Sequence, residues 1–355
     1  MSKKNKKNLR IPDPSNVLII SFLVGAIALI IGGVFLLEIR NSLTKKESLT
    51  SFDQMAYEAH QEKIRMMEEL DSYWKIPELR NVLDKKERDL IRYGRELIMH
   101  TSRYLGPNGS VKNLSNGMNC QNCHLDAGTK IWGNNYAAVA STYPKVRARS
   151  GKMESIEKRI NDCFERSLNG QALDNDSHEM RAIVAYMKFL GTHVKKGETP
   201  EGTGIYNIPF LDRAADPVRG ESIYAEKCAS CHGANGEGML AIDQREYTYP
   251  PLWGPNSYNS GAGLFRMSRL AGYVKYNMPF GATFLDPQMS DEDSWDVSAF
   301  INSQPRPGKD ISNDWPDISK KPIDHPFGPF ADGFSESQHK YGPFKPIKKA
   351  HEANK

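Results

Sequence analysis

The sequence contains CQNCH at residues 120–124 and CASCH at residues 228–232, two copies of the pattern C-x-x-C-H in 355 residues. In this pattern the two thiols add across the vinyl groups of a porphyrin, and the adjacent histidine becomes the proximal ligand of the iron. Paired C-x-x-C motifs also occur in zinc sites and redox dithiols, but neither explains a histidine directly after both pairs. The sequence therefore predicts two covalently bound haem c groups. The predicted attachment and proximal residues are Cys120, Cys123, His124, Cys228, Cys231 and His232.

The surroundings of the two motifs form a weak internal repeat. A helix-like stretch precedes each motif, at residues 88–105 and 216–227, and an amphipathic helix closes each half. We expect the first closing helix to begin at a capping pair formed by Asp176 and Glu179. This arrangement predicts an all-α fold with two tandem cytochrome c domains.

The second axial ligand of each iron must come from a segment well downstream of the histidine. In the second half the candidate is Met278, 46 residues after His232, because a thioether raises the reduction potential and suits electron transfer. Lys275 is an alternative ligand at the same segment. Met278 could also be one of 13 methionines that fill gaps in the core.

In the first half the comparable position, 39 residues after His124, holds Cys163, the one cysteine outside the two motifs. A buried structural cysteine is the ordinary explanation for a lone thiol. However, its neighbourhood, RINDCFERSLNG, is polar, and helical spacing places Arg159, Cys163 and Ser167 on one face. Cationic surroundings favour the thiolate, which ligates iron and attacks sulfur, and they would also bind a small dianion. The nearby arginines are Arg147, Arg149, Arg159 and Arg166.

The N-terminal segment predicts a membrane anchor. Residues 17–37 carry no charge over 21 positions, which is enough to cross a hydrocarbon layer of about 30 Å, and the preceding lysines and arginine indicate a cytoplasmic N-terminus. A cleaved signal peptide is the alternative, but the apolar run is long for one. We therefore expect a single-pass protein of a bacterial inner membrane, with its catalytic domains in the periplasm. The formal net charge of +4 is small for this length, and the lysines are concentrated at the two ends of the chain. The basic residues therefore form no stripe suited to nucleic acid, and we expect no nucleic-acid partner.

Composition and pattern divide the chain into six parts. A charged, helix-prone stretch follows the anchor and predicts a stalk, a Gly/Pro/Thr-rich break separates the two halves, and a Pro-rich tail ends the chain. We expect the tail to wrap around the domains rather than to fold alone. The predicted parts are a basic tail (1–16), an anchor (17–37), a helical stalk (38–85), two cytochrome c domains (86–200 and 201–304) and an extended C-terminal tail (305–355).

Several longer stretches resemble one family, the dihaem thiosulfate dehydrogenases, also described as bifunctional tetrathionate reductases. The resemblance covers roughly residues 85–347, and RINDCFERSLNG is far more specific than C-x-x-C-H. The stretches that carry it are NCQNCHLDAGTK, YPKVRARSGKMESIEKRINDCFERSLNG, SHEMRAIVAYMKFL, CASCHGANGEG, PPLWGPNSYNSGAG, VKYNMPFG and KKPIDHPFGPFADGFSESQHKYGPFKPI.

The resemblance implies that two thiosulfates are coupled to tetrathionate with release of two electrons, or the reverse. It implies an active-site haem ligated by His124 and Cys163 and a relay haem ligated by His232 and Met278, with Lys275 as a possible substitute. By position, Arg149, Arg159 and Ser167 match the family's substrate-binding residues, and Cys163 is expected to take part in the chemistry.

The predicted partner is a cytochrome or a membrane respiratory complex that donates or accepts electrons. The sequence does not fix the direction of the reaction, because both potentials depend on burial and hydrogen bonding around the haems. Two other functions stay open: a non-catalytic, membrane-tethered electron carrier, and a different dihaem enzyme such as a peroxidase or a thiol-modifying sulfur-oxidation subunit. A peroxidase needs an open distal position, whereas Cys163 and Met278 are expected to fill both.

Overall fold

A computed structural model of the chain describes residues 25–26, 29–41, 54–58, 61, 65 and 72–353. The chain divides into two units, Met1–Leu70 and Asp71–Lys355. In the first unit, residues 29–41 and 54–58 are helical. None of the helices formed by these described residues is both long and apolar enough to cross a membrane. Part of the predicted anchor, and most of the predicted stalk before residue 72, lie outside the described residues.

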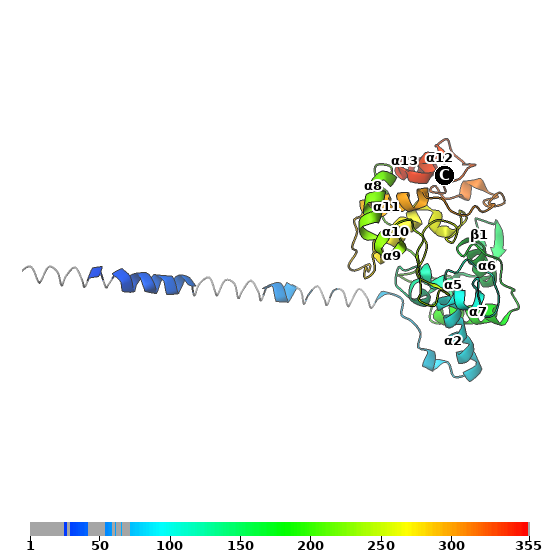
Figure 1. Cartoon of the computed structure of the whole chain (residues 1–355), viewed down its shortest axis with the longest axis horizontal. Helices are drawn as coiled ribbons and strands as arrows, with labels where there is room; N and C mark the ends of the chain where they lie inside the picture. The colour runs from blue at the N-terminus through cyan, green and yellow to red at the C-terminus, as the bar shows by residue number, and fades with distance from the viewer. Residues whose placement is uncertain are drawn as a thin grey trace, which may run out of the picture. The chain divides into compact units, whose positions relative to one another are not determined.

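Residues 72–200, here called the first domain, are mostly helical (Figure 1). Their core begins earlier than the predicted start at residue 86, because Trp74 packs into it. The elements are η1 (Leu79–Asn81), α2 (Lys85–Met99), α3 (Thr101–Leu105), η2 (Cys120–Asn122), α4 (Leu125–Gly128), α5 (Val139–Thr142), β1 (Lys145–Arg147), β2 (Lys152–Glu154), α6 (Ile156–Arg166) and α7 (His178–Leu190).

Residues 201–353, the second domain with the tail, repeat this plan. A short two-stranded antiparallel hairpin accompanies the helices in each domain, β1 with β2 and β3 with β4, so the all-α expectation misses only these small ribbons. The elements are α8 (Pro217–Lys227), α9 (Ala229–His232), β3 (Met239–Leu240), β4 (Tyr247–Tyr249), η3 (Gly263–Phe265), α10 (Met267–Asn277), α11 (Asp291–Ser303), η4 (Ile318–Lys320), α12 (Glu336–Tyr341) and α13 (Phe344–Ala353).

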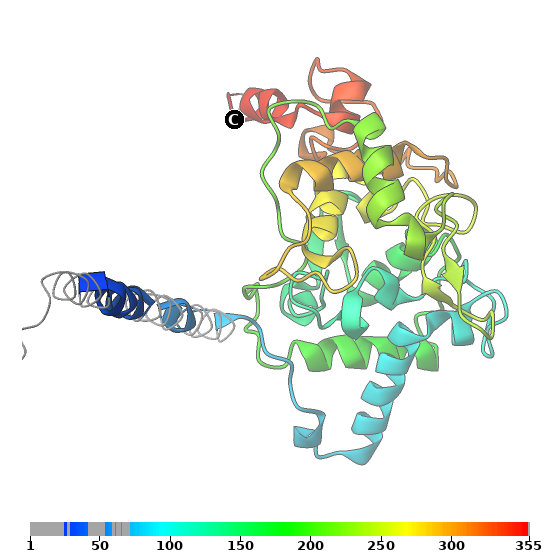
Figure 2. The same ribbon diagram turned by 60° about the vertical axis from the view of Figure 1, so that its left-hand side comes forward.

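In each domain the opening helix crosses the closing helix at a glycine. A Cβ at Gly94 of α2 would lie 2.0 Å from the carbonyl oxygen of Ala182 in α7, and one at Gly220 of α8 would lie 2.0 Å from that of Asp296 in α11. No side chain fits at such a distance, so only glycine lets the two helix backbones approach this closely. The internal repeat is therefore also a repeat of packing, and the helix pairs lie beside the two attachment motifs (Figure 2).

The N-terminus of α7 differs from the predicted capping pair. The hydroxyl of Ser177, rather than the carboxylate of Asp176, accepts the hydrogen bond of the Met180 amide at 3.1 Å. Serine is as good an N-cap as aspartate, and Ser177 lies three residues before Met180, whose amide has no partner within the helix. Glu179 does not bond back to the cap but accepts a hydrogen bond from the hydroxyl of Tyr93 at 3.0 Å.

The tail wraps onto the second domain as expected, but it is not only extended. It ends in α12 and α13, and Phe344 and Ile347 of α13 join the core around Met267 and Trp295. The carbonyl of Tyr341 accepts a hydrogen bond from the amide of Ala215 at 2.8 Å. The apolar stripe of α13 explains why this segment is helical, because its burial against α11 favours the helix more than intrinsic propensity does.

Candidate active site

In the first domain the attachment motif forms the turn η2, and His124 follows it. The Nδ1 of His124 is hydrogen-bonded to the carbonyl oxygen of Asn134, and its ring stacks on Tyr136 with ring centroids 4.5 Å apart. Burial lowers the pKa of His124 to about 4. In a neutral imidazole whose Nδ1–H donates to a carbonyl, Nε2 is unprotonated and its lone pair is free to bind a metal. This is the arrangement that a metal-ligating histidine requires.

The same motif borders a cavity of about 140 Å³ that brings four predicted site residues together with its two thiols. Burial raises the pKa of Cys120 and Cys123 to about 12. The lining residues used below are Cys120, Cys123, His124, Tyr143, Arg159, Cys163 and Ser167.

Cys163 lies on α6, which places three polar groups toward this cavity. The Nη1 of Arg159 lies 3.0 Å from the sulfur of Cys163, one helical turn away. The neighbouring Cys163 raises the pKa of Arg159, so the guanidinium stays charged. Ser167, the C-cap of α6, lies a further turn along and lines the same cavity. The helical spacing predicted this juxtaposition correctly.

Arg149 lies elsewhere. It does not line the cavity of Cys163; its Nη1 donates to the carbonyl of Gly261 at 2.8 Å, and its guanidinium lies 5.5 Å from the ring centroid of Trp315. Arg166 makes a two-pronged ion pair with Asp314, at 2.9 and 2.8 Å. Burial, and then Arg166, lowers the pKa of Arg149 to about 10.

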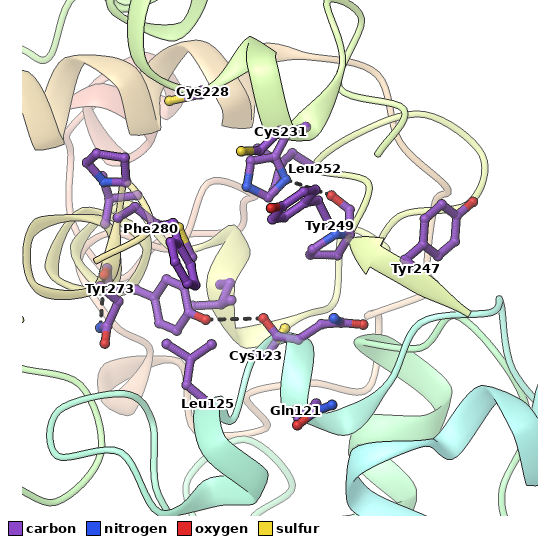
Figure 3. A pocket seen from close by; sticks show the side chains of 18 of the residues that line it. Gln121, Cys123, Leu125, Cys228, Cys231, Tyr247, Tyr249, Leu252, Tyr273 and Phe280 are labelled. Atoms are coloured by element: carbon purple, nitrogen blue, oxygen red, sulfur yellow. Dashed lines mark hydrogen bonds between the residues drawn. The ribbon is translucent and has the colours of Figure 1, made fainter. Parts of the chain in front are cut away.

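In the second domain the motif lies at the end of α8 and in α9. The Nδ1 of His232 is hydrogen-bonded to the carbonyl oxygen of Pro250 at 2.8 Å, and burial lowers the pKa of His232. Cys228, Cys231 and His232 border a cavity of about 680 Å³, and Met278, which follows α10, lines it too. Figure 3 shows the two thiols near the top of this cavity and Tyr273 across it.

Comparison with known proteins identifies the family. A family model described as "SoxA/TsdA, cytochrome c domain" matches residues 110–195, and one for cytochrome c matches residues 217–305. The chain is 41% identical over 218 residues to a thiosulfate dehydrogenase of Allochromatium vinosum, over 60% of this chain and 79% of that protein. It is 37% identical over 245 residues to one of Psychrobacter arcticus, over 68% and 71%.

This chain belongs to the thiosulfate dehydrogenase family.

A solved structure supports the assignment of this chain to the thiosulfate dehydrogenase family. It is the as-isolated form of a thiosulfate dehydrogenase (TsdBA) from Marichromatium purpuratum, with a TM-score of 0.61 and 32% identity. The match covers 67% of this chain and 50% of that chain.

The chain carries two covalently attached haem c groups, and both sites fit them. Each places two thiols beside a cavity, and each has a histidine whose Nδ1 is held by a backbone carbonyl, with Nε2 left for iron. Among the residues that the structure describes, no three His, Cys, Asp or Glu side chains are gathered to hold a metal ion.

The position of Lys275 decides between the two candidates for the second axial ligand at the His232 site. Its ammonium donates to the carbonyl of Met289 at 2.6 Å and lies 3.0 Å from a carboxylate oxygen of Asp291. It does not line the cavity of His232, whereas Met278 does. The geometry therefore favours the thioether.

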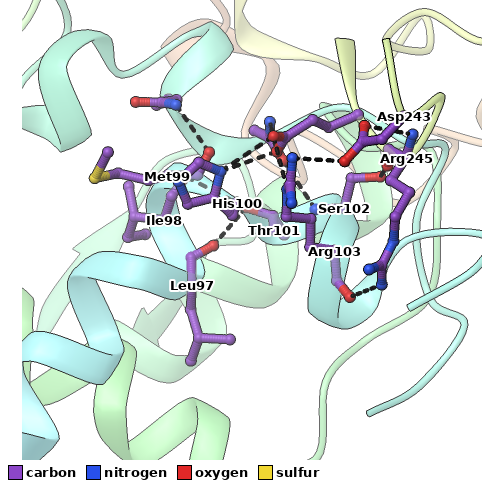
Figure 4. Close-up of polar contacts among 12 residues, drawn as sticks. Leu97, Ile98, Met99, His100, Thr101, Ser102, Arg103, Asp243 and Arg245 are labelled. Carbon is purple, nitrogen blue, oxygen red and sulfur yellow. Dashed lines mark hydrogen bonds and ion pairs between the residues drawn. The ribbon is translucent and has the colours of Figure 1, made fainter. Parts of the chain in front are cut away.

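Sequence reasoning missed the groups that join the two domains. Glu246, in the β3–β4 hairpin region of the second domain, accepts hydrogen bonds from Arg103 at 2.8 Å and from Asn119, next to Cys120, at 3.1 Å. It is also 3.0 Å from Nδ1 of His100. Figure 4 shows Arg103 of the first domain beside Asp243 and Arg245 of the second. Asp314 of the tail is the second missed group. Both carboxylates lie far along the chain from their partners, and no local pattern marks them.

Proposed function

We propose that this chain couples two thiosulfates into tetrathionate at the site of His124 and Cys163, and that the electrons pass to the site of His232 and Met278. The observation that carries the proposal is the position of Cys163, which shares a cavity with His124 and lies 3.0 Å from a guanidinium nitrogen of Arg159. A sulfur nucleophile and a buried cation beside a haem-binding motif suit the oxidation of a sulfur dianion.

The proposed chemistry balances in two steps. The thiolate of Cys163 and the outer sulfur of one thiosulfate form an S–S bond, and two electrons leave. The outer sulfur of a second thiosulfate then attacks the adduct at the sulfur that is bonded to Cys163. This step forms tetrathionate and releases the Cys163 thiolate. The haem groups, when bound, accept the two electrons one at a time and pass them to an external acceptor. The reverse sequence is tetrathionate reduction.

The residues of the chain lower the barrier by handling charge. The guanidinium of Arg159 lies 3.0 Å from the sulfur of Cys163 and offsets repulsion between this sulfur and an incoming dianion. Ser167 and the hydroxyl of Tyr143 line the same cavity and supply hydrogen-bond donors for sulfonate oxygens. Arg149 lies outside this cavity, in the cluster of Arg166 and Asp314.

We further propose that residues 17–37 anchor the chain in a bacterial inner membrane with both domains in the periplasm. The support is the uncharged stretch of 21 residues behind a basic N-terminus. The anchor would keep a membrane respiratory complex or another cytochrome within reach as electron partner. Fractionation tests this: the full chain should stay with washed membranes and be cut by external protease in spheroplasts, and recovery in the soluble periplasmic fraction would contradict it.

Turnover tests the proposed activity. The purified full chain, with artificial electron carriers, should oxidise thiosulfate to tetrathionate and also reduce tetrathionate. Both haems should be reduced by thiosulfate alone. Intact haem spectra with no sulfur turnover in either direction would contradict the proposal and leave a membrane-tethered electron carrier.

A further inference from the structure

The segment that carries Met278 is attached to the first domain just before that residue. The hydroxyl of Tyr273 in α10 donates to the carbonyl of Asn122, inside the first attachment motif, at 3.1 Å (Figure 3). One turn later, Nδ2 of Asn277 donates to the carbonyl of Trp132 at 3.1 Å. Met278 is the next residue, so its position follows from these two contacts.

A third contact lies on the other side of Met278. The ammonium of Lys130, in the first domain, donates to the carbonyl of Ala282 at 3.1 Å. Lys130 is half-buried, so its ammonium is partly withdrawn from water. The three contacts thus involve residues on both sides of Met278 in the sequence, from 273 to 282. All their first-domain groups lie between residues 122 and 132.

These contacts are not needed merely to hold the domains together. Two charged clusters already do so, around Glu246 and around Asp314. By contrast, the contacts around Met278 are directed at backbone carbonyls, and the side chains of Tyr273 and Asn277 are buried, at 5% and 3% exposure. The Tyr273 hydroxyl is directed at one carbonyl and so fixes position, because a shift leaves a buried polar atom unpaired. The Asn277 amide also donates to the Tyr273 carbonyl, at 3.0 Å, and this second bond ties the two residues together.

We propose that Tyr273, Asn277 and Lys130 are positioning residues through which the first domain holds the Met278 sulfur toward the cavity of His232. The inference rests on the proposed His232/Met278 ligation. Since the first-domain groups lie in the segment that contains His124, a displacement of that segment at the active site is transmitted to the ligand of the second haem. The two sites are then coupled by structure as well as by electron transfer.

The test is a competition for the iron in the full-length holoprotein with both haems oxidised. Imidazole displaces a methionine ligand, and the loss of the long-wavelength absorption band of Met-ligated ferric haem reports it. In the double variant Tyr273→Phe/Lys130→Met we expect imidazole to displace Met278 at about tenfold lower concentration, because each lost hydrogen bond makes the Met-free state more populated. The reduction potential of the second haem should fall as well.

The matched control is Tyr93→Phe. The Tyr93 hydroxyl is part-buried and donates to the carboxylate of Glu179 at 3.0 Å, within the first domain and away from the segment of residues 122–132. Its imidazole titration should match that of the unmodified protein. Lys130→Met alone alters one partly exposed contact and should show a smaller shift in the same direction, so a folding defect in the double variant does not remove the test.

Three outcomes would overturn the inference. If the double variant and Lys130→Met both titrate like the unmodified protein, the contacts do not position Met278, and the proposed function stands. If Tyr93→Phe shifts as much as the double variant, the effect is one of general stability rather than of attachment between domains. If the unmodified protein lacks the Met band, the His232/Met278 ligation falls together with the inference, while sulfur turnover at Cys163 is judged separately.

Discussion

The guanidinium of Arg159 lies 3.0 Å from the sulfur of Cys163, one turn away on the same helix, and both line the cavity of His124. This relationship places the sulfur beside a guanidinium cation. It also gives the cavity a positive charge, which the proposed reaction uses where a dianion approaches. The proposed reactivity therefore depends on a pair that α6 itself positions.

Removal of the Arg159 charge should impair catalysis strongly. In Arg159→Met we expect kcat/KM for thiosulfate to fall about 10- to 100-fold, because a hydrogen bond to a charged group contributes about 1.5–3 kcal/mol. Arg181→Met is the control, since Arg181 is exposed on α7 and bonds only to the Asp176 carbonyl in the described contacts. Near-normal kcat/KM in Arg159→Met would show that the cation does not serve the reaction.

The carboxylate of Asp314, in the tail, should stabilise the folded protein through its ion pair with Arg166 of the first domain. Asp314→Asn leaves the buried guanidinium of Arg166 without its ion pair, and breaking a buried pair costs about 3–5 kcal/mol. Chemical denaturation should show a loss of about 3 kcal/mol in the free energy of unfolding. Asp317→Asn, which breaks an exposed pair with Lys320, should change it by less than about 1 kcal/mol; equal effects would contradict the assignment.

Asp296 should make stability depend on pH. Burial tends to raise the pKa of this carboxyl, but hydrogen bonds from Arg213, the Asp216 amide and Arg219 outweigh burial and lower it. A lowered pKa adds stability above the unfolded-state value of about 4, and this stability is lost as pH falls through the folded-state value. Asp296→Asn should thus be less stable at pH 7, with the difference narrowing below about pH 4.

The control for Asp296 is Asp212→Asn, an exposed carboxylate that pairs with Lys345. Its unfolding free energy should follow that of the unmodified protein at every pH. A difference between Asp296→Asn and the unmodified protein that stays constant from pH 7 to pH 3 would mean that the Asp296 charge does not contribute.

The two candidate ligands of the second haem can be separated by mutation. Met278→Ala should abolish the long-wavelength Met band and lower the potential of that haem, because a thioether ligand raises it. Lys275→Gln should leave the band intact, since the Lys275 ammonium is bound to Met289 and Asp291. Survival of the band in Met278→Ala would exclude this methionine as the ligand.

Local sequence determines much of this molecule, and distant contacts determine the rest. The motif at 120–124 and the spacing of Arg159, Cys163 and Ser167 are local, so helical geometry alone predicted that these three share a face. The N-cap of α7 was misassigned by one residue, because Asp176 and Ser177 are both good caps and only the backbone path decides between them.

The position of Arg149 could not be predicted in this way. Its contacts with Gly261 and Trp315 join segments separated by more than one hundred residues, and nothing near Arg149 in sequence marks them. The same holds for Tyr273, which looks like one more aromatic residue of an amphipathic helix until its hydroxyl is found on the Asn122 carbonyl. Tertiary contacts of this kind follow from the packing of the two domains, which short-range patterns do not encode.

The most direct test of the central claim is the turnover of Cys163→Met with thiosulfate, measured beside the unmodified protein with both haems shown to be attached. A thioether is a competent iron ligand but cannot form the S–S bond with thiosulfate. We predict intact haem spectra with thiosulfate oxidation and tetrathionate reduction both lost. Near-normal turnover in this variant would contradict the account, because the sulfur of Cys163 would then be only a ligand or a packed side chain.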